Sequence, residues 1–239
     1  MVWAFSFGLI KTSLQGVDSN FIAAARLGLS LLVFLPFFRP KIVDRQTSLR
    51  LMVVGGVQYG GMYIAYLYSF HYLKAYEVAL FTIFTPLYVT LFDDLFERRM
   101  SWTSLAAVAL AVAGTWIVQW KGSLQPGVML GFWIVQVSNV CFALGQIYYR
   151  RVLTGRKVKD SQVFALPYLG GFLAAGSAAL VFTDWGRLAV TGPQWLTLLY
   201  LGVISSGLCF FLWNVGARQV NAGALAIFND LKIPLSVAV

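Results

Sequence analysis

The chain alternates long apolar segments with short polar ones. Nine apolar segments are predicted as helices: 2–14, 20–38, 51–72, 77–96, 102–120, 127–149, 161–183, 194–217 and 221–239. A helix needs roughly 20 apolar residues to cross the hydrocarbon core of a bilayer. The first segment is shorter and the last stops at the end of the chain, so we expect both to be incomplete. Because the apolar runs are continuous and do not alternate, they exclude a transmembrane β-barrel.

The composition agrees with an all-α polytopic membrane protein. Hydrophobic residues make up 59% of the 239 residues and charged residues only 11%, against about 25% charged in soluble domains. The net charge of +9 does not indicate nucleic-acid binding, because the basic residues lie in short loops between apolar segments. Cys141 and Cys209 fall inside predicted helices, which favours small buried side chains over a disulfide or a metal site.

The basic residues are distributed unevenly between the two sides of the predicted membrane. The loops after the second, fourth, sixth and eighth segments carry twelve: Arg39, Lys41, Arg45, Arg50, Arg98, Arg99, Arg150, Arg151, Arg156, Lys157, Lys159 and Arg218. The opposite loops carry only Lys74, Lys121 and Arg187. By the positive-inside rule, the N-terminus and the basic loops are expected in the cytoplasm, as in a multi-pass protein of the bacterial inner membrane.

An internal repeat is visible as weak matches at two offsets. At 148 residues, Ala75, Pro86 and Leu87 match Gly223, Pro234 and Leu235; at 139, Ala4, Leu14 and Gly16 match Ala143, Leu153 and Gly155. The matches keep the same order, which predicts two five-helix halves, 1–121 and 126–239, with the final helix missing. An odd number of spans inverts the second half relative to the first, as in many secondary transporters.

The segment 221–239 is the first candidate for a binding site. It carries Asn229, Asp230 and Lys232 near its middle and Pro234 after them. A charge at bilayer depth costs about 2.5–3.5 kcal/mol on insertion scales, so it normally faces the protein interior or a wet cavity. Pro234 leaves the carbonyl of Asp230 without its helical donor, a device with which transporters build mid-membrane sites. The alternative is that a neighbouring helix pairs these charges and the segment is only structural.

Two further segments carry candidate side chains. Tyr59, Tyr63 and Tyr66 fall on one face of the predicted helix 51–72, which could line an amphipathic cavity or simply pack against another helix. In the segment 77–96, Pro86 frees the carbonyl of Thr82 as Pro234 frees that of Asp230. We therefore expect Pro86 and Pro234 to act as hinges in equivalent positions of the two halves.

The remaining polar residues within helices are weaker candidates. They are Gln136, Asn139, Gln146, Trp213 and Asn214, and ordinary hydrogen bonds between helices are the alternative for each. The spacing Gly56-x-x-x-Gly60 favours close helix packing. Arg26 and Lys11 lie toward the ends of their segments, so both are expected to reach the membrane surface.

The chain resembles the drug/metabolite transporter superfamily, specifically its ten-helix EamA-type permeases. The resemblance is carried by Trp3-x-x-x-Phe7-x-x-x-Lys11, Arg26, Tyr66-Leu67-Tyr68 through Ala75 to Thr85-Pro86-Leu87, and Phe96-Glu97-Arg98. Ala4 and Phe96 stand where that family usually has glycine. The resemblance implies alternating-access transport of amino acids, related metabolites or drugs, with export favoured over uptake.

The sequence therefore predicts a transporter and not an enzyme. It contains no nucleophile–base arrangement and no phosphate loop, and we expect no catalytic residue, metal or cofactor. Lys232 would attract an anionic group, Asp230 could couple to protons, and the tyrosines and Trp213 would contact the apolar part of the substrate. The expected partners are a small-molecule substrate and the lipid bilayer, with a second copy of the chain as a candidate. The alternatives are a non-transporting membrane scaffold or sensor, or a membrane-embedded enzyme.

Overall fold

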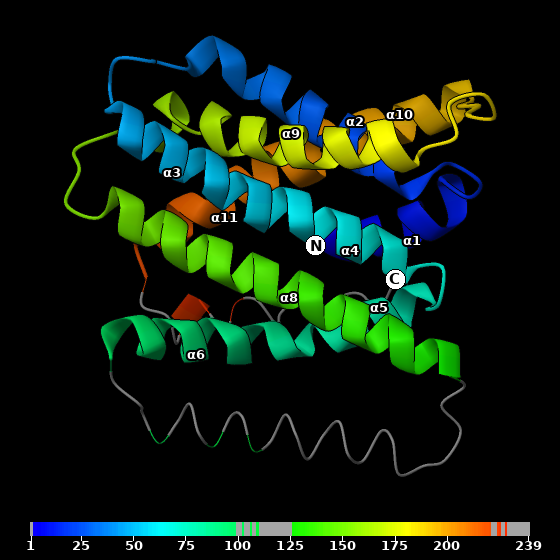
Figure 1. Cartoon of the computed structure of the whole chain (residues 1–239), viewed down its shortest axis with the longest axis horizontal. Coiled ribbons are helices and arrows are strands. Elements are labelled where there is room, and N and C mark those ends of the chain that lie inside the picture. The colour runs from blue at the N-terminus through cyan, green and yellow to red at the C-terminus, as the bar shows by residue number, and fades with distance from the viewer. Residues whose placement is uncertain are drawn as a thin grey trace.

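A computed structural model shows a bundle of helices that run side by side, with short connections at its two ends (Figure 1). It describes residues 2–98, 102, 106, 109, 126–220, 224, 225 and 228. Most of the predicted spans 102–120 and 221–239, including Asn229, Asp230, Lys232 and Pro234, lie outside the described residues.

The described part of the chain is helical and contains no strand. The elements are α1 (Val2–Ser13), α2 (Ser19–Phe34), η1 (Leu35–Phe37), α3 (Arg45–Gly55), η2 (Gly56–Gly61), α4 (Met62–Ser69), α5 (Ala75–Phe81), η3 (Thr82–Phe84), α6 (Thr85–Glu97), α8 (Pro126–Leu153), η4 (Asp160–Gln162), α9 (Ala165–Phe182), α10 (Gly192–Tyr200), η5 (Leu201–Leu208) and α11 (Cys209–Ala217). Five helical stretches among these are long and apolar enough to cross a membrane: 19–37, 75–97, 127–153, 165–182 and 192–217. The predicted all-α membrane fold is therefore confirmed.

The helices pack in an order that places α9 and α8 centrally. α9 packs between α2 and the continuous stretch α3–η2–α4, and α8 packs between that stretch and α6 (Figure 1). The stretch α10–η5–α11 lies against α2, and the short helix α1 contacts α5 and η5. Segments far apart in sequence thus surround α1 near the middle of the bundle, where the candidate site is found.

Glycines bring α3–η2 and α9 together at backbone distance. A Cβ built on Gly55 would lie 1.7 Å from the carbonyl oxygen of Pro167, and one on Gly170 would lie 1.8 Å from that of Met52. A Cβ on Gly60 would lie 2.6 Å from the Cβ of Ala174. Close approach of this kind is typical of small residues at helix interfaces in membranes, where apolar side chains gain nothing by leaving the lipid.

Polar side chains join the helices at the end of the bundle that carries the basic loops. Arg218 pairs with Asp160 at 2.6 Å, and the hydroxyl of Tyr149 donates to the same carboxylate at 2.6 Å. Arg151 of α8 pairs with Glu97 of α6 at 2.5 Å. These contacts tie α6, α8, η4 and the end of α11 to one another, so this end of the bundle is closed by ion pairs.

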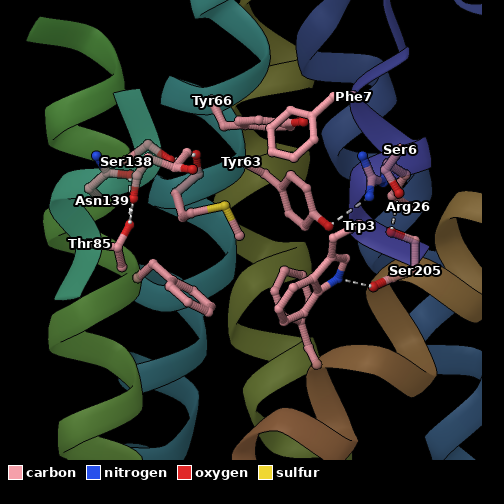
Figure 2. Close-up of a pocket in the computed structure, with 14 residues that line it drawn as sticks. Trp3, Ser6, Phe7, Arg26, Tyr63, Tyr66, Thr85, Ser138, Asn139 and Ser205 are labelled. Atoms are coloured by element: carbon pink, nitrogen blue, oxygen red, sulfur yellow. Dashed lines mark hydrogen bonds between the residues drawn. The ribbon is translucent and has the colours of Figure 1, made fainter. Parts of the chain in front are cut away.

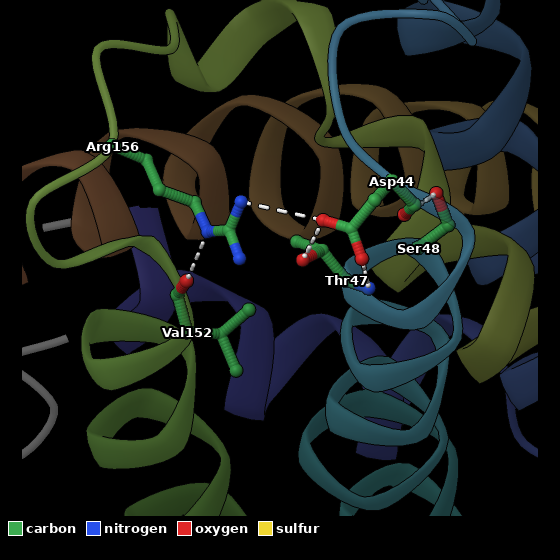
Figure 3. A network of polar contacts seen from close by, with 5 residues as sticks. All are labelled: Asp44, Thr47, Ser48, Val152 and Arg156. Carbon is green, nitrogen blue, oxygen red and sulfur yellow. Dashed lines mark hydrogen bonds and ion pairs between the residues drawn. The ribbon is translucent and has the colours of Figure 1, made fainter.

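Asp44 explains why the helix predicted over 51–72 begins earlier, at Arg45. Its carboxylate accepts a hydrogen bond from the backbone N–H of Thr47 at 3.0 Å and another from the Thr47 hydroxyl at 2.6 Å (Figure 3). An acidic N-cap of this kind satisfies donors that a helix leaves free in its first turn. Arg156 approaches the same carboxylate at 3.3 Å and links α3 to the loop after α8.

We expect the Asp44 cap to make stability depend on pH. The hydrogen bond from the Thr47 hydroxyl, and next that from the Thr47 N–H, lower the pKa of Asp44 below its ordinary value of 3.8. A carboxyl group with a lowered folded-state pKa stabilises the fold above the unfolded pKa, and that contribution is lost as the pH falls through the folded value. Asn at this position keeps a cap acceptor but does not titrate.

The melting temperature of the wild-type protein in detergent should therefore fall more steeply between about pH 5 and about pH 2 than that of Asp44→Asn. Parallel melting curves for the two proteins over this range would show that the Asp44 cap does not contribute to acid sensitivity.

Candidate functional site

A cavity lies in the middle of the bundle, where α1 and α2 meet α4, α6 and α8. It is lined by Trp3, Ser6, Phe7, Arg26, Met62, Tyr63, Tyr66, Thr82, Thr85, Ser138, Asn139, Phe142, Ser205 and Phe210. Arg26, Ser6 and Ser205 stand on one side of it, and Thr85, Ser138 and Asn139 on the other (Figure 2). The cavity therefore has two polar walls with aromatic side chains between them.

Arg26 dominates the first wall. Its side chain is fully enclosed, with the residue 1% exposed. Nε donates to the hydroxyl of Ser206 at 3.0 Å, and Nη2 donates to the hydroxyl of Tyr63 at 2.8 Å. The guanidinium carbon also lies 4.5 Å from the centre of the Tyr63 ring, close enough for a cation–π contact.

The Arg26 guanidinium keeps unused binding capacity. Nη1 is buried and has no hydrogen-bond partner within the described residues, and no carboxylate of the described chain pairs with the group. A buried cation without an acid is costly, and a buried N–H without an acceptor calls for an explanation. The arrangement is therefore able to receive an anion.

The position of Arg26 differs from the sequence expectation. We expected this side chain to reach the membrane surface from the end of its helix, and that expectation is wrong. Arg26 lies in the middle of α2, and its side chain points into the bundle toward Tyr63 (Figure 2). It also donates to the hydroxyl of Ser206.

The helix opposite α2 is shaped to present hydroxyl groups to Arg26. In η5 the helix widens to a π-helical turn over Leu201–Leu208, a geometry often found at functional sites. The carbonyls of Ser206 and Gly207 then accept hydrogen bonds from the Tyr168 hydroxyl of α9, at 2.6 and 2.7 Å. Ser30 of α2 donates to the carbonyl of Gly202 at 2.8 Å. These contacts fix Ser206 beside the guanidinium.

The second polar wall is built around the interruption of the fourth span. A 3-10 turn at Thr82–Phe84 separates α5 from α6 directly before Pro86. Pro86 has no N–H to donate to the carbonyl of Thr82. This carbonyl accepts a hydrogen bond from the Thr85 hydroxyl at 2.8 Å instead. Asn139 of α8 donates to the carbonyl of Phe81 at 2.9 Å, and its side-chain oxygen accepts from the Thr85 hydroxyl at 3.1 Å. Whether Pro86 works as a hinge stays a prediction.

Aromatic rings close the space between the two walls. Trp3 lies with its ring centre 5.0 Å from that of Phe210 and 6.4 Å from that of Phe142, and its indole N–H donates to the carbonyl of Ser205 at 2.9 Å. Phe7 and Tyr66 meet edge to face at 5.8 Å on another side of the cavity. The cavity can therefore hold a molecule that is polar at both ends and apolar in its middle.

The predicted site residues divide into three groups. Tyr63, Tyr66, Thr82 and Asn139 line the cavity. Gln136 lies behind its second wall, where its side-chain oxygen accepts from Asn139 at 3.1 Å. The third group, which consists of Tyr59, Gln146, Trp213 and Asn214, lies away from the cavity lining.

A separate polar layer lies next to the aromatic rings and is formed by Tyr59, Gln146, Trp213 and Asn214. Asn214 donates to the Tyr59 hydroxyl at 2.8 Å, and Trp213 donates to Gln146 at 2.8 Å. The Trp213 ring also lies 5.5 Å from that of Trp3, which separates this layer from the cavity. Asn229, Asp230, Lys232 and Pro234 are outside the described residues. A substrate role for all of these residues remains a prediction.

Arg26 and Ser6 line the cavity but were not predicted from the sequence as binding residues. The signal that could have identified Arg26 was a charge within an apolar segment that has no acidic residue three or four positions away. Ser6 gave no signal, because its hydroxyl meets that of Ser205, 199 residues away in the sequence.

Comparison with known proteins gives consistent matches over the chain. Residues 1–120 match the model of the EamA-like transporter family. Two proteins named biotin transporter, from Salmonella typhimurium and from Escherichia coli K12, are each 39% identical over all of this chain and 80% of their own length. A probable biotin transporter of Pseudomonas aeruginosa is 39% identical over 99% of this chain and 84% of its own.

A solved crystal structure shares the fold. It superposes with a TM-score of 0.72 at 17% identity, over 99% of this chain and 83% of its own. At this identity the likeness speaks for the arrangement of the helices alone.

Proposed function

Because this chain belongs to the EamA-like transporter family, we propose that it is a permease that carries biotin across the membrane through its central cavity. It is a multi-pass membrane transporter and not an enzyme, as its family and its relatives indicate. The names of the relatives support biotin as the substrate, and the chemistry of the cavity supports it independently.

The observation that carries the proposal is the buried guanidinium of Arg26 with its free Nη1. Biotin ends in a carboxylate, and a charge-assisted hydrogen bond from a guanidinium is about twice as strong as a neutral one. In a dry cavity the ion pair also removes the cost of an unpaired cation. A carboxylate at this position would thus provide an acceptor for Nη1, the guanidinium nitrogen of Arg26 that the described protein leaves without a hydrogen-bond partner.

The rest of the cavity suits the remainder of the same molecule. The neutral ureido group of biotin needs both donors and acceptors, which Asn139, Thr85 and Ser138 offer on the second wall. The aliphatic chain and the sulfur-containing ring are apolar and would lie among Trp3, Phe142 and Phe210. We assign the carboxylate to the Arg26 wall and the ureido group to the Asn139 wall.

The family resemblance implied amino acids, related metabolites or drugs, with export favoured. An amino acid brings an ammonium group as well as a carboxylate, and no acidic side chain is among the described residues of the cavity lining. This favours a singly charged carboxylate over a zwitterion. Export as the direction of transport stays a prediction.

Several features predicted from the sequence remain part of the proposal. They are location in the inner membrane, a cytoplasmic N-terminus and two inverted halves, 1–121 and 126–239. The family match over residues 1–120 supports a boundary near residue 121, and the basic loops at one end of the bundle support the orientation. Alternating access would then expose the Arg26 cavity to each side in turn.

The proposal is tested by counterflow of labelled biotin into proteoliposomes that contain the full-length protein. We expect accumulation of label against unlabelled biotin inside. Desthiobiotin, which keeps the carboxylate and the ureido group, should compete, whereas biotinamide, which lacks the charge, should compete at least about tenfold less well. Counterflow of an amino acid without counterflow of biotin would overturn the assignment.

A further inference from the structure

We propose that a second anion site, at Lys11, receives the substrate carboxylate before it reaches Arg26, and that a row of three aromatic rings separates the two sites. This inference rests on the proposed function, since it concerns the route to the same cavity. It concerns a depression between α1, α2 and the end of α4, which we call the vestibule. Its lining includes Lys11, Leu14, Ile22, Leu67, Phe70 and His71.

The vestibule continues the central cavity along the same three helices. On α1 the cavity is lined by Trp3, Ser6 and Phe7, and the vestibule follows within one turn with Ile10 and Lys11. On α2 the order is Arg26 and then Ile22, and on α4 it is Tyr66 and then Phe70. The vestibule therefore lies between the central cavity and the end of the bundle opposite the basic loops (Figure 1).

Lys11 gives the vestibule a positive charge. Its ammonium group donates to the carbonyl of Phe70 at 2.7 Å, and the residue is exposed. An ammonium group has three donors, and no ion pair of Lys11 occurs within the described residues.

Among the described residues, no acidic side chain lines the vestibule. His71 lines it and brings no negative charge. The nearest acid along the chain, Asp18, caps α2 by accepting from the N–H groups of Asn20 and Phe21 and also accepts from Thr183 at 2.5 Å. A cavity lined with one sign of charge concentrates ions of the other sign.

Three rings form the wall between the vestibule and the central cavity. Phe7 meets Tyr66 edge to face at 5.8 Å, and Tyr66 meets Phe70 edge to face at 5.2 Å. Phe7 and Tyr66 line the cavity, whereas Phe70 lines the vestibule. All three side chains are buried, so the wall is closed in this structure.

Lys11 is joined to this wall directly. The carbonyl that its ammonium group holds belongs to Phe70, the residue that follows the last turn of α4. A substrate carboxylate that binds Lys11 would compete with the Phe70 carbonyl for the N–H donors of the ammonium group. It would do so next to the Phe70 ring, which the substrate must pass to reach the central cavity. The structural alternative is that Lys11 only satisfies the free carbonyl at the end of α4.

The two readings differ in a measurement that does not need biotin. We would replace Cys141 and Cys209 by Ala, place a cysteine at Gln15 in the vestibule, and compare its reaction rates with an anionic and a cationic methanethiosulfonate reagent. With Lys11 present the anionic reagent should be favoured, and Lys11→Gln should lower the ratio of the two rates by roughly tenfold at low salt. High salt should reduce the difference.

Transport provides the second arm. Lys11→Gln should raise the KM for biotin several-fold at low salt and leave the rate at saturating biotin near that of the wild type, because Arg26 still holds the bound carboxylate. Lys74→Gln is the matched control, since Lys74 is an exposed lysine at the same end of the bundle that does not line the vestibule.

The outcomes separate the two proposals. A thiol rate ratio that Lys11→Gln leaves unchanged would overturn the Lys11 site, even if biotin is transported. Failure of biotin counterflow together with a Lys11-dependent rate ratio would overturn biotin as the substrate and leave the anion site supported. Equal effects of Lys11→Gln and Lys74→Gln on KM would also count against the vestibule, because they would indicate only general surface charge.

Discussion

Arg26→Gln is expected to abolish specific biotin binding while the protein still folds. Truncating one partner of a buried, hydrogen-bonded charge pair costs about 2–5 kcal/mol, which corresponds to a loss of affinity of roughly thirtyfold to several thousandfold. Folding should survive, because the variant also removes a buried cation that has no acid partner in the described protein. The Gln amide is still able to reach one of the two hydroxyls, of Ser206 or Tyr63, that Arg26 holds.

The decisive readout is selectivity for the carboxylate. Wild-type protein should bind biotin far more tightly than biotinamide, and Arg26→Gln should bind both about equally weakly, because only the charged contact is lost. Arg26→Lys keeps the charge but not the planar fork of donors, so it should retain part of the preference. Arg187→Gln, an exposed arginine in the loop before α10, is the matched control. A folded Arg26→Gln protein that still prefers biotin would place the carboxylate elsewhere.

The helices themselves could be predicted well from the apolar pattern, because each span must cover the bilayer core with apolar side chains. The ends were less predictable. α3 starts at Arg45 and not near residue 51, because Asp44 caps it through Thr47. α8 extends to Leu153 beyond the predicted residue 149. Polar residues at a span end continue the helix whenever a cap or an ion pair supports them, and hydropathy does not record this.

The tyrosine face shows why part of the site escaped prediction. Tyr59, Tyr63 and Tyr66 share one face of a regular helix, yet only Tyr63 and Tyr66 line the cavity. Tyr59 lies in the π-helical turn η2, whose wider winding rotates it away, and its ring stacks on that of Tyr168 at 5.1 Å. The sequence periodicity assumed a uniform helix, and this one changes its winding next to the site.

Arg26 escaped prediction for a different reason. Its environment is made by α4 and η5, and Ser206 of η5 is far away in sequence. Hydropathy indicates that a charged residue lies within a span but not which side of the helix faces the bundle. Thr82 could be identified because the break before Pro86 shows in the sequence of the same span. Asn139 could be identified because it is a polar residue within an apolar span.

The contact between α3–η2 and α9 carries the second large expected effect, on folding. Gly170→Ala adds one methyl group, and its Cβ would lie 1.8 Å from the carbonyl oxygen of Met52. Neither helix backbone can yield locally, so the two helices must separate along the whole contact. Overpacking of a dense interior costs typically about 1–3 kcal/mol and occasionally more; because the clash is with backbone, we expect the upper end or beyond.

Gly176→Ala provides the control within the same helix, because a Cβ at Gly176 meets no atom within 4 Å. We expect Gly170→Ala, and likewise Gly55→Ala against the carbonyl of Pro167, to lower the melting temperature in detergent strongly and to lose the monodisperse peak in size exclusion. Gly176→Ala should match or slightly exceed wild type, since alanine favours the helix. If Gly170→Ala has the same melting temperature as Gly176→Ala, α3 and α9 do not touch at their backbones. The placement of η2 and Tyr59, which depends on this contact, would then have to change as well.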